Sequence, residues 1–134
     1  MLQFFLKRYI CIINKKVNMS KVYLTQDIPI DKLTGQPKYN IIGAQKYGKV
    51  EVIFPRKSQM LYSPAPFIMK IRMALSKFNP EEDYLLLSGD PAIILTFGLV
   101  IAEMYGKVKV LKWDRQEMQY YPVEINLKEQ LTSM

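Results

Sequence analysis

The chain contains no histidine and only one cysteine, Cys11, among its 134 residues. Without an imidazole there is no Ser–His or Cys–His nucleophile pair and no histidine-ligated zinc site. A single cysteine excludes both a disulfide within the chain and a cysteine cluster for a metal. Because these absences remove many enzyme classes, we favour a non-enzymatic role and expect no cofactor and no metal site.

Phosphate-binding glycine motifs and long apolar runs are missing as well. Neither G-x-G-x-x-G nor G-x-x-x-x-G-K-[ST] occurs anywhere in the sequence, so the dinucleotide and P-loop signatures are absent. The two apolar runs of residues 1–18 are split by Lys7 and Arg8. Each is far shorter than the about 20 residues of a membrane span. We therefore expect no transmembrane segment.

Residues 1–18 differ in composition from the rest of the chain, with four basic residues and no acidic residue. Three interpretations compete: translation from a start codon upstream of the true start at Met19, an interfacial membrane segment, or an additional strand. We favour the first, because the sequence after Met19 is self-contained. The predicted organisation is a leader over residues 1–18 outside the native domain, one α/β domain over 19–127, and a polar tail over 128–134.

The net charge of +7 is unevenly distributed. Residues 19–77 contain ten basic and three acidic residues, whereas residues 78–134 contain five basic and nine acidic ones. This pattern argues against a general nucleic-acid binder but permits a local basic patch. The candidate patch comprises Lys46, Lys49, Arg56, Lys57 and Lys70. Tyrosines lie among them, and such an arrangement can bind a nucleic-acid backbone and stack on its bases. The alternative is a solvated face.

A strand, a turn and a helix start form the centre of the sequence. Tyr84–Leu87 is a short apolar run between acidic and turn-forming residues, which is typical of a buried strand. Asp90 and Pro91 then predict a helix N-terminus, because Asp can accept bonds from free first-turn amides and Pro suits the first helical position. Gly89 precedes them as the turn residue.

The helix that follows is almost entirely apolar. Between Ala92 and Tyr105 only Thr96 and Glu103 are strongly polar, so we expect the helix to be mostly buried. Gly106 predicts a left-handed stop, and the alternation over 107–113 predicts the next strand. Together these elements form a right-handed βαβ unit.

The other elements follow from similar patterns. Strands are predicted over 21–25 and 49–54, and a second helix, with Ser63 as the cap, places Phe67, Ile71, Ala74, Leu75 and Phe78 on one face. Residues 30–48 are turn-rich and predict a long irregular loop with a short extended piece at 39–42. Glu81, Glu82 and Asp83 predict a solvated loop.

Residues 118–125 complete an antiparallel hairpin with 107–113. The predicted fold is a small Rossmann-like α/β mixed sheet of about five strands with two main helices and this C-terminal hairpin.

Two predicted strand ends carry candidate ligand-binding residues. Ser88, Gly89 and Asp90 follow the central strand and Asp27 follows the first one. Open α/β sheets bind ligands at the carboxyl ends of their strands, and the negative Asp90 favours a hydroxyl or ribose contact over a phosphate. The alternative is that Gly89 makes the turn and the aspartates form turns and caps. A metal-assisted hydrolase that uses Asp27 and Asp90, with magnesium as the candidate ion, is the least favoured hypothesis.

The C-terminal hairpin is aromatic and predicts an interaction surface. Its candidate interface residues are Trp113, Tyr120 and Tyr121. Tyr and Trp are enriched at protein interfaces, and an edge strand is a template for pairing. A homodimer through this edge or through the central helix is the expected assembly, and another protein is the alternative partner.

Several stretches resemble small uncharacterised proteins of tailed bacteriophages, notably those of aquatic bacteria. The similar stretches are Val22–Pro29, Ser88–Ile93, Leu111–Arg115 and Tyr121–Ile125. The resemblance covers most of residues 19–127, brings no catalytic residue, and implies a setting in the host bacterial cytoplasm. We therefore expect a non-enzymatic phage accessory or interaction protein. A nucleotide- or nucleic-acid-binding module that uses the Ser88–Pro91 turn and the Arg56–Lys57 loop is the alternative.

Overall fold

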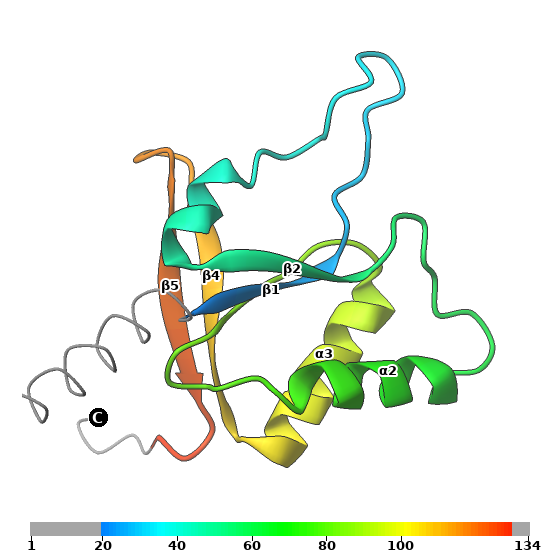
Figure 1. The fold of residues 1–134 in the computed structure, drawn as a ribbon, viewed down its shortest axis with the longest axis vertical. Coiled ribbons are helices and arrows are strands. Elements are labelled where there is room, and N and C mark those ends of the chain that lie inside the picture. The colour runs from blue at the N-terminus through cyan, green and yellow to red at the C-terminus, as the bar shows by residue number, and fades with distance from the viewer. Residues whose placement is uncertain (1–19, 130–134) are drawn as a thin grey trace, which may run out of the picture.

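The structure is a computed structural model that describes residues 20–129, and these form a five-stranded sheet with helices packed against it (Figure 1). The strands are β1 (Lys21–Gln26), β2 (Lys49–Phe54), β3 (Tyr84–Leu86), β4 (Lys107–Asp114) and β5 (Gln119–Asn126). Their order is β2-β1-β3-β4-β5, with β5 antiparallel to β4 and all other pairs parallel. The predicted α/β mixed sheet with a C-terminal hairpin is confirmed. The leader at 1–18 lies outside the described residues, and the division into leader, domain and tail stays a prediction.

Two helices cover one face of the sheet, and a short 3₁₀ helix lies on the other. Figure 1 shows α2 (Ala65–Leu75) beside α3 (Pro91–Met104). The core under them includes Tyr23, Phe54, Ile71, Leu75 and Phe97. On the opposite face, η1 (Ile42–Tyr47) places its buried Ala44 against Val22, Leu24, Leu86 and Leu111. Alternate side chains of β1 therefore enter two separate cores, as the two-residue period of a strand requires.

The start of α3 follows the predicted local signals, but the start of α2 does not. The Asp90 carboxylate accepts the Ala92 N–H at 3.1 Å and Pro91 is the first helical residue. Gly106 after α3 has a φ of +74°. The cap of α2 is Pro64, with no side-chain hydrogen bond, so the prediction of Ser63 as cap is wrong. The prolines at 64 and 66 fix the helical φ there, which starts the helix without a polar cap.

The prediction that the central helix is mostly buried is wrong. Ile93, Phe97, Val100 and Ile101 are buried, but Leu95 is 64% and Leu99 63% exposed. Composition alone cannot say whether a second layer covers an apolar helix. Among residues 20–129 the only long helix beside α3 is α2, which packs against one side of it, so the other side of α3 faces outward.

The long segment between β1 and β2 reaches away from the sheet and then returns to it (Figure 1). It contains an isolated bridge between Ile30 and Pro37 and ends in η1. The predicted extended piece at 39–42 is wrong, because the Asn40 side-chain oxygen accepts the Ile42 N–H at 2.9 Å and turns the chain into η1.

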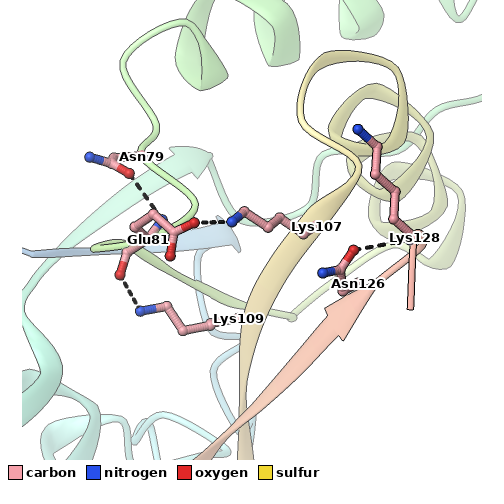
Figure 2. A network of polar contacts seen from close by, with 6 residues as sticks. All are labelled: Asn79, Glu81, Lys107, Lys109, Asn126 and Lys128. Carbon is pink, nitrogen blue, oxygen red and sulfur yellow. Dashed lines mark hydrogen bonds and ion pairs between the residues drawn. The ribbon is translucent and has the colours of Figure 1, made fainter. Parts of the chain in front are cut away.

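The acidic loop before β3 is fastened to β4 by lysines. Figure 2 shows the Lys107 ammonium against the Glu81 carboxylate and the Lys109 ammonium against the Glu81 carbonyl oxygen. The Asn79 side chain accepts the Glu81 N–H at 2.9 Å. Asp83 is buried. The prediction of a solvated loop is therefore wrong for Asp83, and the loop is a structural joint between α2, β3 and β4.

Candidate functional site

The strand order places a topological switch point between β1 and β3. The chain runs from β1 outward to β2, and from β3 outward in the other direction to β4. In open α/β sheets, ligands bind outside the carboxyl ends of the strands at such a point. Leu24 and Leu86 are partners in the parallel β1–β3 register, so Asp27 and the Ser88–Asp90 turn follow neighbouring strand ends.

Side chains of β1 fasten the turn after β3. The Thr25 hydroxyl accepts the Ser88 N–H at 2.8 Å and donates to the Ser88 carbonyl at 2.6 Å. The Gln26 amide oxygen accepts the Asp90 N–H at 2.9 Å, and its nitrogen donates to the Ser58 carbonyl at 3.1 Å. A Cβ atom on Gly89, whose φ is +95°, would lie 2.1 Å from that amide oxygen. Glycine is therefore required here by both conformation and space.

The two candidate carboxylates hold separate local partners. Asp90 accepts the Ala92 N–H with one oxygen and the Met60 N–H, at 2.8 Å, with the other. Asp27 accepts the Ile28 N–H at 2.9 Å and lies 3.3 Å from the Arg56 guanidinium. The capping role considered for Asp90 is thus present. Within residues 20–129, no group of three or more His, Cys, Asp or Glu side chains is placed to hold a metal ion.

A cleft of about 650 Å³ opens at the carboxyl ends of β3 and β4, mainly on the face that carries η1, and reaches Ile94 of α3. We call it the carboxyl-edge cleft. Leu86 and Leu111 form its apolar floor, and Ser88 and Gly89 contribute the turn after β3. The remaining polar and aromatic lining comprises Lys38, Tyr39, Asn40, Trp113, Arg115 and Tyr120. Two of the four candidate ligand-binding residues, Ser88 and Gly89, therefore line a cavity.

Strand alternation divides the three aromatic residues predicted as an interface. Trp113 and Tyr120 are opposite each other in the hairpin, with ring centroids 5.0 Å apart, and both line the carboxyl-edge cleft. Tyr121 is paired with Lys112 and points to the face that carries α3. The Tyr120 hydroxyl donates to the Asn40 carbonyl at 3.2 Å, and burial raises the pKa of Tyr120. Trp113 and Tyr120 thus belong to the cleft, not to the face of Tyr121.

The predicted basic residues are distributed over both faces of the sheet. Lys46 lies over the Tyr47 ring on the η1 side, with 5.1 Å to the centroid, and Lys70 of α2 lies over the Phe54 ring at 4.7 Å. Lys49 begins β2, and Arg56 and Lys57 follow its end. A nucleic-acid role for these residues stays a prediction.

Lys38 and Arg115 are the basic residues of the cleft, and neither was singled out from the sequence. Arg115 could have been found, because it directly follows β4 at the carboxyl edge of the sheet. Lys38 had no such signal, since it lies in the irregular segment between β1 and η1.

Buried tyrosines make stability depend on pH in the alkaline range. Burial, with a smaller effect of Asp83 and Glu51, raises the pKa of Tyr23 to about 12, and burial also raises the pKa of Tyr105. A folded-state pKa above the unfolded value of about 10 means that this stabilisation is complete below about pH 10 and is lost as pH rises through about 12. We expect urea unfolding to show this loss of stability at alkaline pH, and we expect the loss to be smaller in the variant Tyr23→Phe. Tyr62→Phe, at a 96% exposed position, is the control and should lose as much stability at alkaline pH as the wild-type chain. An equal effect of both variants would contradict the assignment of this loss to Tyr23.

The fold and the cleft define a small open α/β sheet protein with a cavity beside its switch point. Residues 20–127 match the model of a family described as Phage Pam3 gp32-like protein, so the chain belongs to this family of phage proteins. The resemblance to small phage proteins is thereby confirmed. Comparisons with curated proteins and with solved structures found no match. None of the helices in residues 20–129 is both long enough and apolar enough to cross a bilayer.

Proposed function

We propose that this chain is a non-enzymatic accessory protein that acts in the host bacterial cytoplasm through its surface, and that it works as a homodimer. The observation that carries the proposal is an apolar face next to the outer side of α3. No residue with a catalytic role is part of the proposal.

This uncovered apolar face comprises Leu87, Leu95, Leu99, Tyr121, Ile125 and Leu127, each between 39% and 65% exposed. It exists because α3 leaves its outer side and the adjacent side of β5 without a covering helix among the described residues. Scattered single apolar residues are normal on a surface, whereas a contiguous group marks an interaction site.

The shape of the face favours a second copy as the partner. Leu95 and Leu99 project from α3, and Gly98 and Ala102 lie beside them at helical spacings. An apolar groove of about 270 Å³ runs between this helix and β4–β5, with Gly98, Ala102 and Ile125 in its lining. A two-fold interface requires projections and depressions on one surface, because each copy presents the same patch to the other.

Charge does not oppose such a contact. The exposed row of α3, from Leu95 to Ala102, contains no charged residue. Although each copy has a net charge of +7, no like charges of the two copies therefore meet at the centre of the contact. Charged residues are depleted at the cores of protein interfaces, and this row has that composition.

We expect the combined variant Leu95→Glu, Leu99→Glu to be monomeric under conditions where the wild-type chain is dimeric. Burial of a leucine contributes about 1.5–3 kcal/mol, and each leucine is buried twice across a two-fold axis. The dimer dissociation constant should therefore rise by more than about 100-fold. Size-exclusion chromatography with light scattering, over a range of protein concentrations, measures it.

The matched control is Met69→Glu, Met73→Glu, which changes two similarly exposed apolar residues on α2. We expect this variant to remain dimeric. A wild-type chain that is monomeric at every concentration contradicts self-association and leaves another protein as the occupant of the face. Equal dissociation of both variants would place the interface elsewhere.

A further inference from the structure

The carboxyl-edge cleft contains an unused polar group. Ser88 is 8% exposed, and its hydroxyl oxygen is buried with no hydrogen-bond partner in the structure of residues 20–129. Its backbone N–H and carbonyl both bond to Thr25, so the side chain is not needed to hold the turn. Buried polar groups are nearly always paired. Ser88 lines the cleft, so a ligand bound there can supply the missing partner when the serine side chain turns toward it.

The charge of the cleft selects an anionic ligand. Lys38 and Arg115 both belong to its lining, and no aspartate or glutamate does. Asp90 is outside the lining, and its carboxylate is engaged with the Met60 and Ala92 amides. Arginine is suited to phosphate because its donors form a planar fork.

The aromatic side chains of the cleft select a planar ring. Tyr39 is 59% and Trp113 41% exposed, although both line the cavity. Tyr120 packs against the Trp113 ring from one side and leaves part of the indole accessible. Stacking of a base on such a ring contributes about 1–3 kcal/mol. The volume of about 650 Å³ lies within the range of small-molecule sites.

We propose that the carboxyl-edge cleft binds a free mononucleotide. The base contacts Trp113 and Tyr39, Arg115 and Lys38 bind the phosphate, and the Ser88 hydroxyl pairs with a sugar hydroxyl. Leu87 and Ile94 line both this cleft and the groove beside α3, so the site adjoins the proposed dimer contact, but Ser88, Trp113 and Arg115 are not part of that contact. It differs from the arrangement predicted from sequence, because its positive charge comes from Lys38 and Arg115 and not from the Arg56–Lys57 loop.

The test uses the full chain and its single tryptophan, Trp113. Titration with adenosine and thymidine monophosphates, followed by tryptophan fluorescence and by calorimetry, should give saturable binding. Adenosine without phosphate and inorganic phosphate alone should each bind at least about tenfold more weakly, since each loses one of the two recognition elements. A single-stranded oligonucleotide is the fourth ligand.

Two variants and a control locate the site. Arg115→Gln should weaken mononucleotide binding at least about tenfold, because it removes a charge-assisted contact. Ser88→Ala should weaken it about two- to tenfold without loss of stability, because no internal bond is removed. Lys57→Gln changes an exposed basic residue outside the cleft and should leave binding unchanged.

Any of three results overturns the proposal. The first is the absence of binding by every mononucleotide to the wild-type chain. The second is equal weakening by Lys57→Gln and Arg115→Gln. The third is tighter binding of the oligonucleotide together with mononucleotide binding that is lost in Lys57→Gln and kept in Arg115→Gln, which would place the nucleotide contact at the basic loop and not in the cleft.

Discussion

We expect Gly48→Ala to lower the free energy of unfolding by about 2–6 kcal/mol, a large part of the about 5–15 kcal/mol of a typical domain. Gly48 has φ +154° and ψ +175°, a region that is essentially limited to glycine and costs other residues about 1–3 kcal/mol. A Cβ atom would also lie 2.2 Å from the Ser20 carbonyl oxygen. Since that oxygen accepts the Lys49 N–H where β1 and β2 begin to pair, relief of the clash disturbs the sheet, at a further about 1–3 kcal/mol.

Urea unfolding, followed by circular dichroism, measures this loss. The control is Gly35→Ala, because Gly35 also has a positive φ, +69°, but a Cβ atom there would meet no atom within 4 Å. We expect the control to cost about 1 kcal/mol, which is the penalty for a left-handed conformation alone. Equal losses for the two variants would show that the contact with Ser20 is unimportant.

Local signals in the sequence predicted most of the elements. The strand at 49–54 was predicted with the observed bounds, because β-branched residues lie between Gly48 and Pro55. The start of α3 was predicted because Asp90 and Pro91 act within one helical turn. Such features depend on neighbours in the sequence, so one sequence is sufficient to recognise them.

The wrong or missed predictions concern the packing of elements that are distant in the sequence. The apolar sequence of α3 is the same whether its outer side is covered or not, so the exposure of Leu95 and Leu99 depends on the placement of α2. The carboxyl-edge cleft could be predicted only with knowledge of the strand order. Lys38 and Arg115 are far apart in the sequence and line one cavity only because β4 pairs with β3. Ser88 and Gly89 were predicted because they directly follow a strand, which is a local feature with a known structural consequence.

Asp83→Ala is the second substitution that we expect to be strongly destabilising, by about 2–4 kcal/mol. The Asp83 side chain is buried and accepts the Lys21 N–H at 2.9 Å and the Asn79 N–H at 2.7 Å. It therefore joins the start of β1 to the loop that leads into β3. Alanine leaves two partly buried amides without this acceptor, and each costs about 1–2 kcal/mol, in the lower part of the range for a fully buried donor.

Asp114→Ala is the matched control for the measurement by urea unfolding. Asp114 also accepts two backbone N–H groups, those of Gln116 and Glu117, but in an exposed turn where water can replace the carboxylate. Its loss should cost no more than about 1 kcal/mol, and equal losses would contradict the role of burial. A third variant, Asp83→Asn, gives a separate readout. The charge of Asp83 contributes to the raised pKa of Tyr23, so its removal should lower that pKa, which titration of tyrosine absorbance can follow.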